Sequence, residues 1–86
     1  MRLAMTTTPL LDVVAVQIEA PYQLLLTFEN GETRRFDMAP LLMRKPYLSL
    51  ADPARFAQTQ VVAGTVAWPG EIDIAPETLY QRSRPM

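Results

Sequence analysis

Cysteine and histidine are both absent from this sequence of 86 residues. Without cysteine the chain forms no disulfide, zinc–thiolate site or iron–sulfur cluster, and it offers no thiol nucleophile. Without histidine it lacks the side chain that most often serves as a general base or metal ligand. Serine–histidine–aspartate and cysteine–histidine catalytic arrangements are therefore excluded. We predict a protein that is not an enzyme and that holds no cofactor or metal.

An excess of charge is also missing. Eight Lys and Arg residues face nine Asp and Glu residues, which gives a formal net charge of −1. Domains that bind nucleic acids usually carry a basic excess or a basic stripe, so direct nucleic-acid binding is disfavoured. No apolar run approaches the length of a membrane span, and Asp12 interrupts the N-terminal apolar run with no cleavage site after it. These features predict a cytoplasmic protein without a membrane segment.

Glycine is scarce, with three residues, whereas eight prolines divide the chain into short segments. A chain of this length is one domain, and the close spacing of the prolines leaves no room for a long helix. We expect a flexible tail at 1–8, a single domain at 9–82 and a second flexible tail at 83–86.

The secondary structure follows from short runs of β-branched and aromatic residues. Strands are predicted at 12–19, 22–29, 32–38, 59–64, 65–68 and, as a further short strand, 71–74. Short helical segments are predicted at 38–43 and 52–57, and a last helix starts at Pro76. This order predicts an α+β domain built on a small antiparallel sheet of about five strands, with short helical turns and a C-terminal helix.

Asn30 and Gly31 predict a tight hairpin, because both residues tolerate the positive φ that such turns require. Two registers are possible. A two-residue loop pairs Leu25 with Phe36, whereas a three-residue loop with a left-handed Gly31 pairs Leu24 with Phe36. We favour the three-residue loop, because a slip of one residue moves side chains to the opposite face. It gathers these large side chains on one face: Tyr22, Leu24, Leu26, Phe28 and Phe36.

Other turn and cap residues mark the ends of the predicted elements. Pro69-Gly70 predicts a turn, with proline and glycine at its second and third positions. Asp37 and Asp52 are expected to cap the helical segments that follow them. Asp73 is expected to accept backbone N–H groups at the entry to the last helix, which Pro76 opens.

Two of the predicted strands do not alternate apolar with polar residues. Successive side chains in a strand point to opposite faces. "VVAV" at 13–16 and "LLL" at 24–26 therefore predict a sheet that is apolar on both faces. Either loops wrap the second face or another copy of the chain covers it, and a homodimer is the preferred prediction.

The loop that contains Arg44, Lys45 and Tyr47 is the best exposed candidate for an interaction site. Two cations beside an aromatic ring are suited to a phosphate or an acidic partner. Against this interpretation, a basic doublet is a weak signal and most loops are only solvated.

Two features near the C-terminal end have both a structural and a functional interpretation. Trp68 is a candidate interaction residue, because tryptophan is enriched at interface hot spots. A core position packed on Pro76 and Tyr80 is the favoured alternative. Asp73 and Glu77 are a candidate acid–base or cation site, but caps and helix-dipole partners are the commoner role of such residues.

From Asp12 to Tyr80 the chain resembles a small bacterial family catalogued as domain of unknown function 2442. These positions carry the resemblance: Phe28, Asn30, Gly31, Asp37, Pro40, Leu41, Phe56, Trp68, Asp73, Pro76, Leu79 and Tyr80. The chain departs from the family at Pro69-Gly70, where an Asn-Gly type of turn is common. The resemblance implies a small α+β fold with no established catalysis.

The resemblance also implies partners. By this resemblance, family members are stand-alone proteins or partners of helix-turn-helix segments. Some are encoded beside other small proteins of unknown role, in the way that toxin–antitoxin pairs are. We therefore predict a non-enzymatic protein-interaction module with an unknown protein partner. The alternative is a regulatory or antitoxin-like component that acts with a DNA-binding or toxin partner.

Overall fold

The computed structural model describes residues 11–19 and 21–85. The strands are β1 (Val13–Ile18), β2 (Gln23–Phe28), β3 (Thr33–Asp37), β4 (Gln60–Val62), β5 (Thr65–Trp68), β6 (Ile72–Ile74) and β7 (Arg84–Pro85). The helical segments are the 3₁₀ helices η1 (Ala39–Met43) and η2 (Leu48–Ala51) and the α-helices α1 (Pro53–Phe56) and α2 (Pro76–Arg82). The tail predicted at 1–8 lies outside the described residues.

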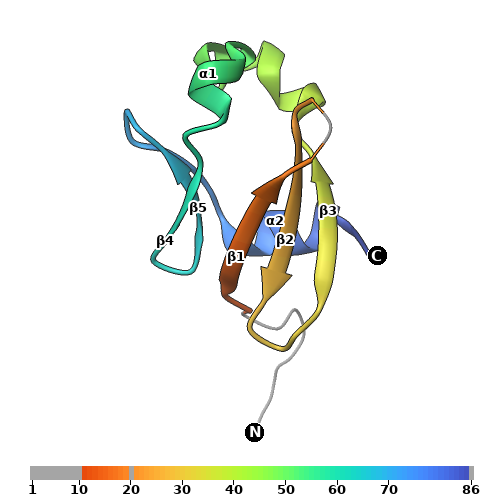
Figure 1. Cartoon of the computed structure of the whole chain (residues 1–86). Helices are drawn as coiled ribbons and strands as arrows, with labels where there is room; N and C mark the ends of the chain where they lie inside the picture. Colours follow the sequence, from red (N-terminus) through yellow and green to blue (C-terminus); the bar gives the residue numbers. More distant parts are fainter. Residues whose placement is uncertain (1–10, 20, 86) are drawn as a thin grey trace, which may run out of the picture.

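The strands form two antiparallel sheets, ordered β1-β2-β3-β7 and β4-β5-β6 (Figure 1). The 3₁₀ helices and α1 gather at one end of the molecule, and α2 crosses behind the first sheet. The predicted α+β class is confirmed, although the described strands are seven and divide between two sheets. Within the segment predicted as a C-terminal tail, Arg84 and Pro85 form β7 and pair with β3.

The hairpin of β2 and β3 has the predicted three-residue loop. Leu24 pairs with Phe36, and the Phe28 N–H donates to the Glu32 carbonyl at 2.8 Å. Gly31 has a φ of 87°, the left-handed conformation that favours glycine. This register turns Leu24 and the other alternate apolar residues of β2 toward the interior.

A single hydrophobic core joins the two sheets. The first sheet contributes Val13, Leu24, Leu26, Phe28 and Phe36, and the second contributes Val66, Trp68, Ile72 and Ile74. Met38, Leu50, Phe56 and Leu79 complete the core from the connecting and helical segments. The two sheets are therefore two walls of one domain.

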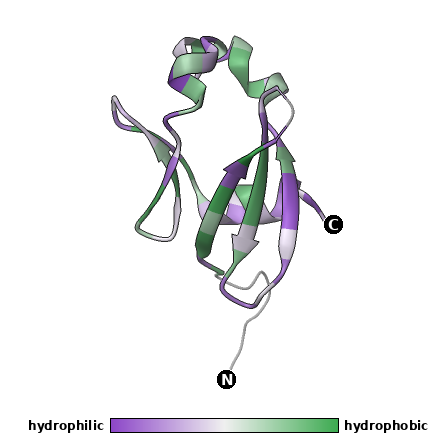
Figure 2. Cartoon of the chain, in the orientation of Figure 1, coloured by the Kyte–Doolittle hydropathy of each residue, from purple (hydrophilic) through white to green (hydrophobic). Residues whose placement is uncertain are grey.

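The prediction of a sheet that is apolar on both faces is wrong in most of its extent. A bulge near the start of β1 lets Val13 and Val16 both turn toward the core. On the opposite face, Leu25 is half-buried and lies between Gln17 and Arg35 on the neighbouring strands. Figure 2 shows the middle of β3 as hydrophilic. That face therefore needs no second copy to cover it.

Two aspartates meet the helical segments differently. Asp52 is the N-cap of α1, and its Oδ1 accepts the Ala54 N–H at 3.0 Å. Asp37 is the last residue of β3, and the N-cap of η1 is Met38, with no side-chain cap bond. The predicted cap therefore lies one residue too early in the chain. The Asp37 carboxylate nevertheless accepts the Ala39 N–H at 3.0 Å.

The cap predicted for the last helix is wrong. Asp73 is an exposed residue of β6, and the N-cap of α2 is Ala75, without a side-chain hydrogen bond. Pro76 opens α2 because its fixed φ suits a first helical position. The Pro69-Gly70 turn joins β5 to β6, with Gly70 at a φ of 95°.

Candidate functional site

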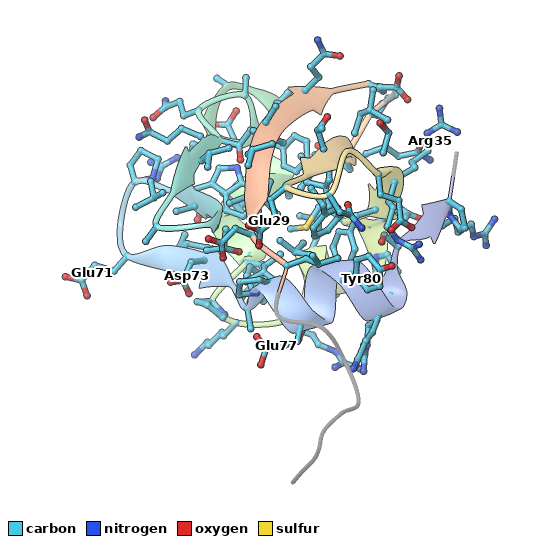
Figure 3. The ribbon with its side chains drawn as sticks, turned by 90° about the horizontal axis from the view of Figure 1, so that it is seen from below. Glu29, Arg35, Glu71, Asp73, Glu77 and Tyr80 are labelled. Atoms are coloured by element: carbon cyan, nitrogen blue, oxygen red, sulfur yellow. The ribbon has the colours of Figure 1, made fainter. Side chains whose placement is uncertain are left out.

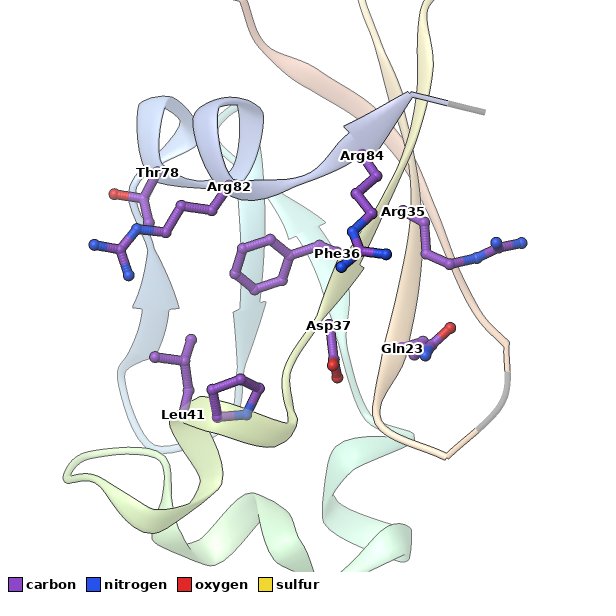
Figure 4. A pocket seen from close by; sticks show the side chains of 9 residues that line it. Gln23, Arg35, Phe36, Asp37, Leu41, Thr78, Arg82 and Arg84 are labelled. Carbon is purple, nitrogen blue, oxygen red and sulfur yellow. The ribbon is translucent and has the colours of Figure 1, made fainter.

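An open groove of about 360 Å³ lies where β3, η1, α2 and β7 meet (Figure 4). Its lining residues are Gln23, Arg35, Phe36, Asp37, Pro40, Leu41, Thr78, Arg82 and Arg84. They come from separate parts of the sequence, and the pairing of β7 with β3 brings them together.

The end of α2 is fixed to β3 by Arg34. The Arg34 guanidinium donates to the Ser83 hydroxyl at 2.6 Å and to the Ser83 carbonyl at 2.9 Å. The Ser83 hydroxyl in turn donates to the Tyr80 carbonyl at 3.0 Å. Ser83 is buried, with 7% of its surface exposed, and lies between the last residue of α2 and the first of β7. These bonds place Arg82 and Arg84 on the groove.

A second set of contacts holds α2 against the first sheet. The Tyr80 hydroxyl donates to Glu32 Oε1 at 2.8 Å, and Arg34 Nη1 lies 2.6 Å from Glu32 Oε2. The hydrogen bond from Tyr80, and then that from Arg34, lowers the pKa of Glu32. The same bond to Glu32, with some burial, raises the pKa of Tyr80. Arg34 also lies 4.4 Å from the centre of the Tyr80 ring. All these groups are mutually paired, so they form the frame of the groove and do not line it.

Positive charge dominates the groove. Three arginines line it against the single carboxylate of Asp37. Arg35 forms an ion pair with Glu19 at 2.7 Å. Arg82 and Arg84 are exposed, and neither side chain has a hydrogen bond or ion pair to another residue in the described part of the chain. Two guanidinium groups are therefore available to an incoming anion.

The surface beneath these charges is apolar. Phe36 is 3% exposed, and in Figure 4 its ring lies between Arg82 and Arg84. Leu41 and Pro40 close the far side of the groove, with Leu41 half-buried. This combination suits a ligand that carries both an anionic and an apolar group. It offers binding groups and no paired acid and base.

Trp68 is a core residue. Only 3% of its surface is exposed, and its Nε1 donates to the Phe56 carbonyl at 2.9 Å. Its ring packs on Phe56, with the ring centres 5.9 Å apart. Tyr80, one of its two predicted neighbours, makes its edge-to-face ring contact with Phe28 instead. Trp68 is thus not placed to anchor a partner at the surface.

The three residues of the candidate interaction loop, Arg44, Lys45 and Tyr47, differ in their exposure to solvent. Arg44 and Lys45 are exposed, as predicted for a surface loop. Tyr47 is half-buried, and its hydroxyl donates to the Asp73 carbonyl at 3.0 Å. Burial, and then the charge of Asp73, raises the pKa of Tyr47. The tyrosine therefore ties the loop to β6, and the two cations remain without the predicted aromatic neighbour at the surface.

The carboxylates of the last third of the chain do not converge. Figure 3 shows Glu71, Asp73 and Glu77 pointing to separate places. None of them lines the groove, and the described residues contain no cluster of three potential metal ligands. The geometry that an acid–base or cation site requires is therefore not present among these three residues.

Sequence reasoning missed the groove because its charges are far apart in the chain. In the sequence, Arg82 and Arg84 form only a small basic cluster near the C-terminal end, and Arg35 lies nearly fifty positions earlier. Only the β3–β7 pairing places Arg84 opposite Arg35.

The chain is a small α+β protein with an arginine-lined groove. The family model of DUF2442, a protein of unknown function, matches residues 13–85. The chain therefore belongs to the DUF2442 family. A search of the curated proteins and a search of the solved structures found no match. Among the described residues, none of the helices has the length and apolar character to cross a membrane.

Proposed function

We propose that this protein is a non-enzymatic interaction module that forms a homodimer through β1. The observation that carries the proposal is the character of this edge strand. Val13–Ile18 contains no charged residue and no proline. Two of its apolar side chains reach solvent, with 55% of the surface of Val14 and 38% of that of Ile18 exposed. Proteins usually protect an edge strand with charges, proline or a covering segment, because its free backbone groups pair readily with another strand.

The neighbouring strand extends the apolar surface. β4 is the edge of the second sheet and contacts β1, and its Val62 is 46% exposed. The Val13 N–H donates to the Gly64 carbonyl at 2.8 Å, so the β4–β5 turn covers the beginning of β1. The later residues of β1 have no strand on that side within the described chain. Two identical strands pair antiparallel about a two-fold axis, which makes a closed dimer the simplest assembly.

The test is the mass of the protein in solution by size-exclusion chromatography with light scattering. The wild type is expected at twice the mass of one chain at high concentration. Val14→Lys and Ile18→Lys should shift it to the monomer, because each places a charge on the edge. Met43→Lys is the matched control, since Met43 is 81% exposed in η1 and the change in charge is the same. A wild type that stays monomeric at millimolar concentration, or equal effects of all three variants, contradicts the proposal.

An antitoxin-like role is compatible with this proposal when the partner is a protein. A role that needs direct DNA recognition finds less support. The two α-helices of the described chain have four and seven residues. Recognition helices in the major groove present several successive side chains to the bases, which such short helices do poorly.

A further inference from the structure

We propose that the groove between β3 and α2 binds an extended acidic segment of a partner protein. The surface differs from the β1 edge, so this inference does not depend on the dimer. Its ligand is recognised by three features: a free strand edge, unpaired arginines and an apolar floor.

The strand edge comes first. β7 pairs only with Arg34 and Arg35, so no described strand lies on that side of the rest of β3. Phe36 pairs with Leu24 of β2, and the Met38 N–H donates to the Tyr22 carbonyl at 2.8 Å. Because hydrogen-bonding directions alternate along an antiparallel strand, the backbone groups of Asp37 face the groove side. A peptide that adds here as a strand gains main-chain hydrogen bonds to Asp37.

Charge then selects the peptide. Arg82 and Arg84 come from two sides of the Phe36 ring and have no acidic partner in the described chain (Figure 4). Guanidinium groups bind carboxylates through two parallel hydrogen bonds. Acidic side chains of the ligand are therefore the groups that these arginines fit.

The apolar floor of the groove determines which other side chains the peptide ligand carries. Pro40 and Leu41 present apolar surface beside the arginines, and the nearly buried Phe36 ring also lines the groove. The volume of about 360 Å³ is near the lower limit of ligand pockets, so it admits a few side chains of an extended segment. Side chains alternate along a strand, which predicts acidic residues that alternate with aliphatic ones.

A nucleic acid fits the groove less well. Asp37 places a carboxylate on the wall, and the whole chain has a net charge of −1. Nucleic-acid affinity rises with the number of phosphates that are neutralised at once, and two free arginines supply few such contacts.

The experiment uses a fluorescein-labelled peptide of eight residues that alternates glutamate and valine, with fluorescence anisotropy as the readout at low ionic strength. We expect saturable binding by the full chain and no binding of the matching lysine–valine peptide. Arg82→Gln with Arg84→Gln should weaken binding on the order of tenfold, as loss of charge-assisted bonds does. Arg44→Gln with Lys45→Gln removes the same two positive charges from an exposed loop outside the groove and should leave binding unchanged.

Asp37→Asn gives a second, opposite test. It removes the carboxylate from the groove and keeps an oxygen to accept the Ala39 N–H. Acidic peptide binding should become about two- to fivefold tighter, the range expected from one surface charge. In the wild type, amide shifts in an NMR titration should centre on Phe36 and Leu41.

Three results overturn the proposal. The first is the lack of saturable binding at millimolar protein. The second is an equal loss in Arg44→Gln with Lys45→Gln, which indicates non-specific attraction. The third is displacement of the peptide by a short DNA duplex at lower concentration than by unlabelled peptide, which assigns the groove to nucleic acid.

Discussion

Arg34 bonds three parts of the molecule through one guanidinium group. It contacts Glu32 within the hairpin, the Tyr80 ring on α2 and Ser83 before β7. Its side chain is only 12% exposed, and these partners satisfy a charge that is costly to bury alone. The position of the groove depends on this residue, although Arg34 does not line it.

Tyr80→Phe should change the pH dependence of stability. The pKa of Glu32 lies below its usual 4.5, so the stabilisation that it provides is present above that pH and is lost as pH falls through the lowered pKa. The pKa of Tyr80 lies above its usual 10.0, so its stabilisation is present below that pH and is lost as pH rises through the raised pKa.

In the variant, the pKa of Glu32 moves toward its usual value, because the bond from Tyr80 is gone. We expect a lower urea midpoint at neutral pH and a smaller loss of stability as pH falls below 4.5, so that the variant and the wild type converge at acid pH. Tyr22→Phe is the control, since Tyr22 donates to the Ala51 carbonyl and not to an acid. A loss of stability on acidification that is as large in Tyr80→Phe as in the wild type contradicts this assignment.

The hairpins show how elements of similar sequence differ in their surroundings. Both the β2–β3 and β4–β5 turns contain a glycine with positive φ, at 87° for Gly31 and 82° for Gly64. Nothing lies within 4 Å of a Cβ built on Gly31. A Cβ on Gly64 would lie 2.6 Å from the Asp12 carboxyl carbon, because this turn packs against the start of β1.

Alanine substitutions at Gly31 and Gly64 separate the cost of a left-handed backbone from the cost of the close contact with Asp12. Gly31→Ala should destabilise by about 1–2 kcal/mol, the cost of a left-handed non-glycine residue. Gly64→Ala should destabilise by more, because the Asp12 carboxylate must also move. Urea unfolding measures both, and Asp12→Ala in the Gly64→Ala background should remove the excess. Equal losses in the two single variants would show that the contact with Asp12 has no energetic effect.

At the scale of the whole molecule, one core spans both sheets. Core residues of the first sheet and of the second belong to the same buried cluster. The sheets therefore have no separate interiors, and neither is expected to survive without the other.

Unfolding should accordingly be a single transition. Trp68 is the only tryptophan and lies in β5, so its fluorescence reports the second sheet, whereas circular dichroism reports the whole backbone. We expect the two signals to share one urea midpoint, with a slope in the range of about 1–3 kcal/mol per molar. Separate midpoints would show that the second sheet unfolds independently. Equal protein concentrations are required, because a dimer makes the midpoint depend on concentration.

The local sequence determined much of this fold. Gly31 and the spacing of apolar residues in 22–29 fixed the register of the hairpin, because turn chemistry and the two-residue period act over a few neighbours. Thr65–Trp68 was predicted with its observed bounds, and Pro76 marked the start of α2 because the fixed φ of proline suits a first helical position. The lack of cysteine and histidine excluded thiol and imidazole chemistry, because no way of folding the chain can supply a side chain that it does not contain.

Tertiary structure decided the rest. The bulge in β1 turns Val13 and Val16 to one face, which corrected the prediction of a two-sided apolar sheet. The division into two sheets, the position of Trp68 and the pairing of β7 all depend on contacts between distant segments. The groove shows the same limit, since its arginines become neighbours only when α2 packs on the sheet, and no local pattern encodes that contact.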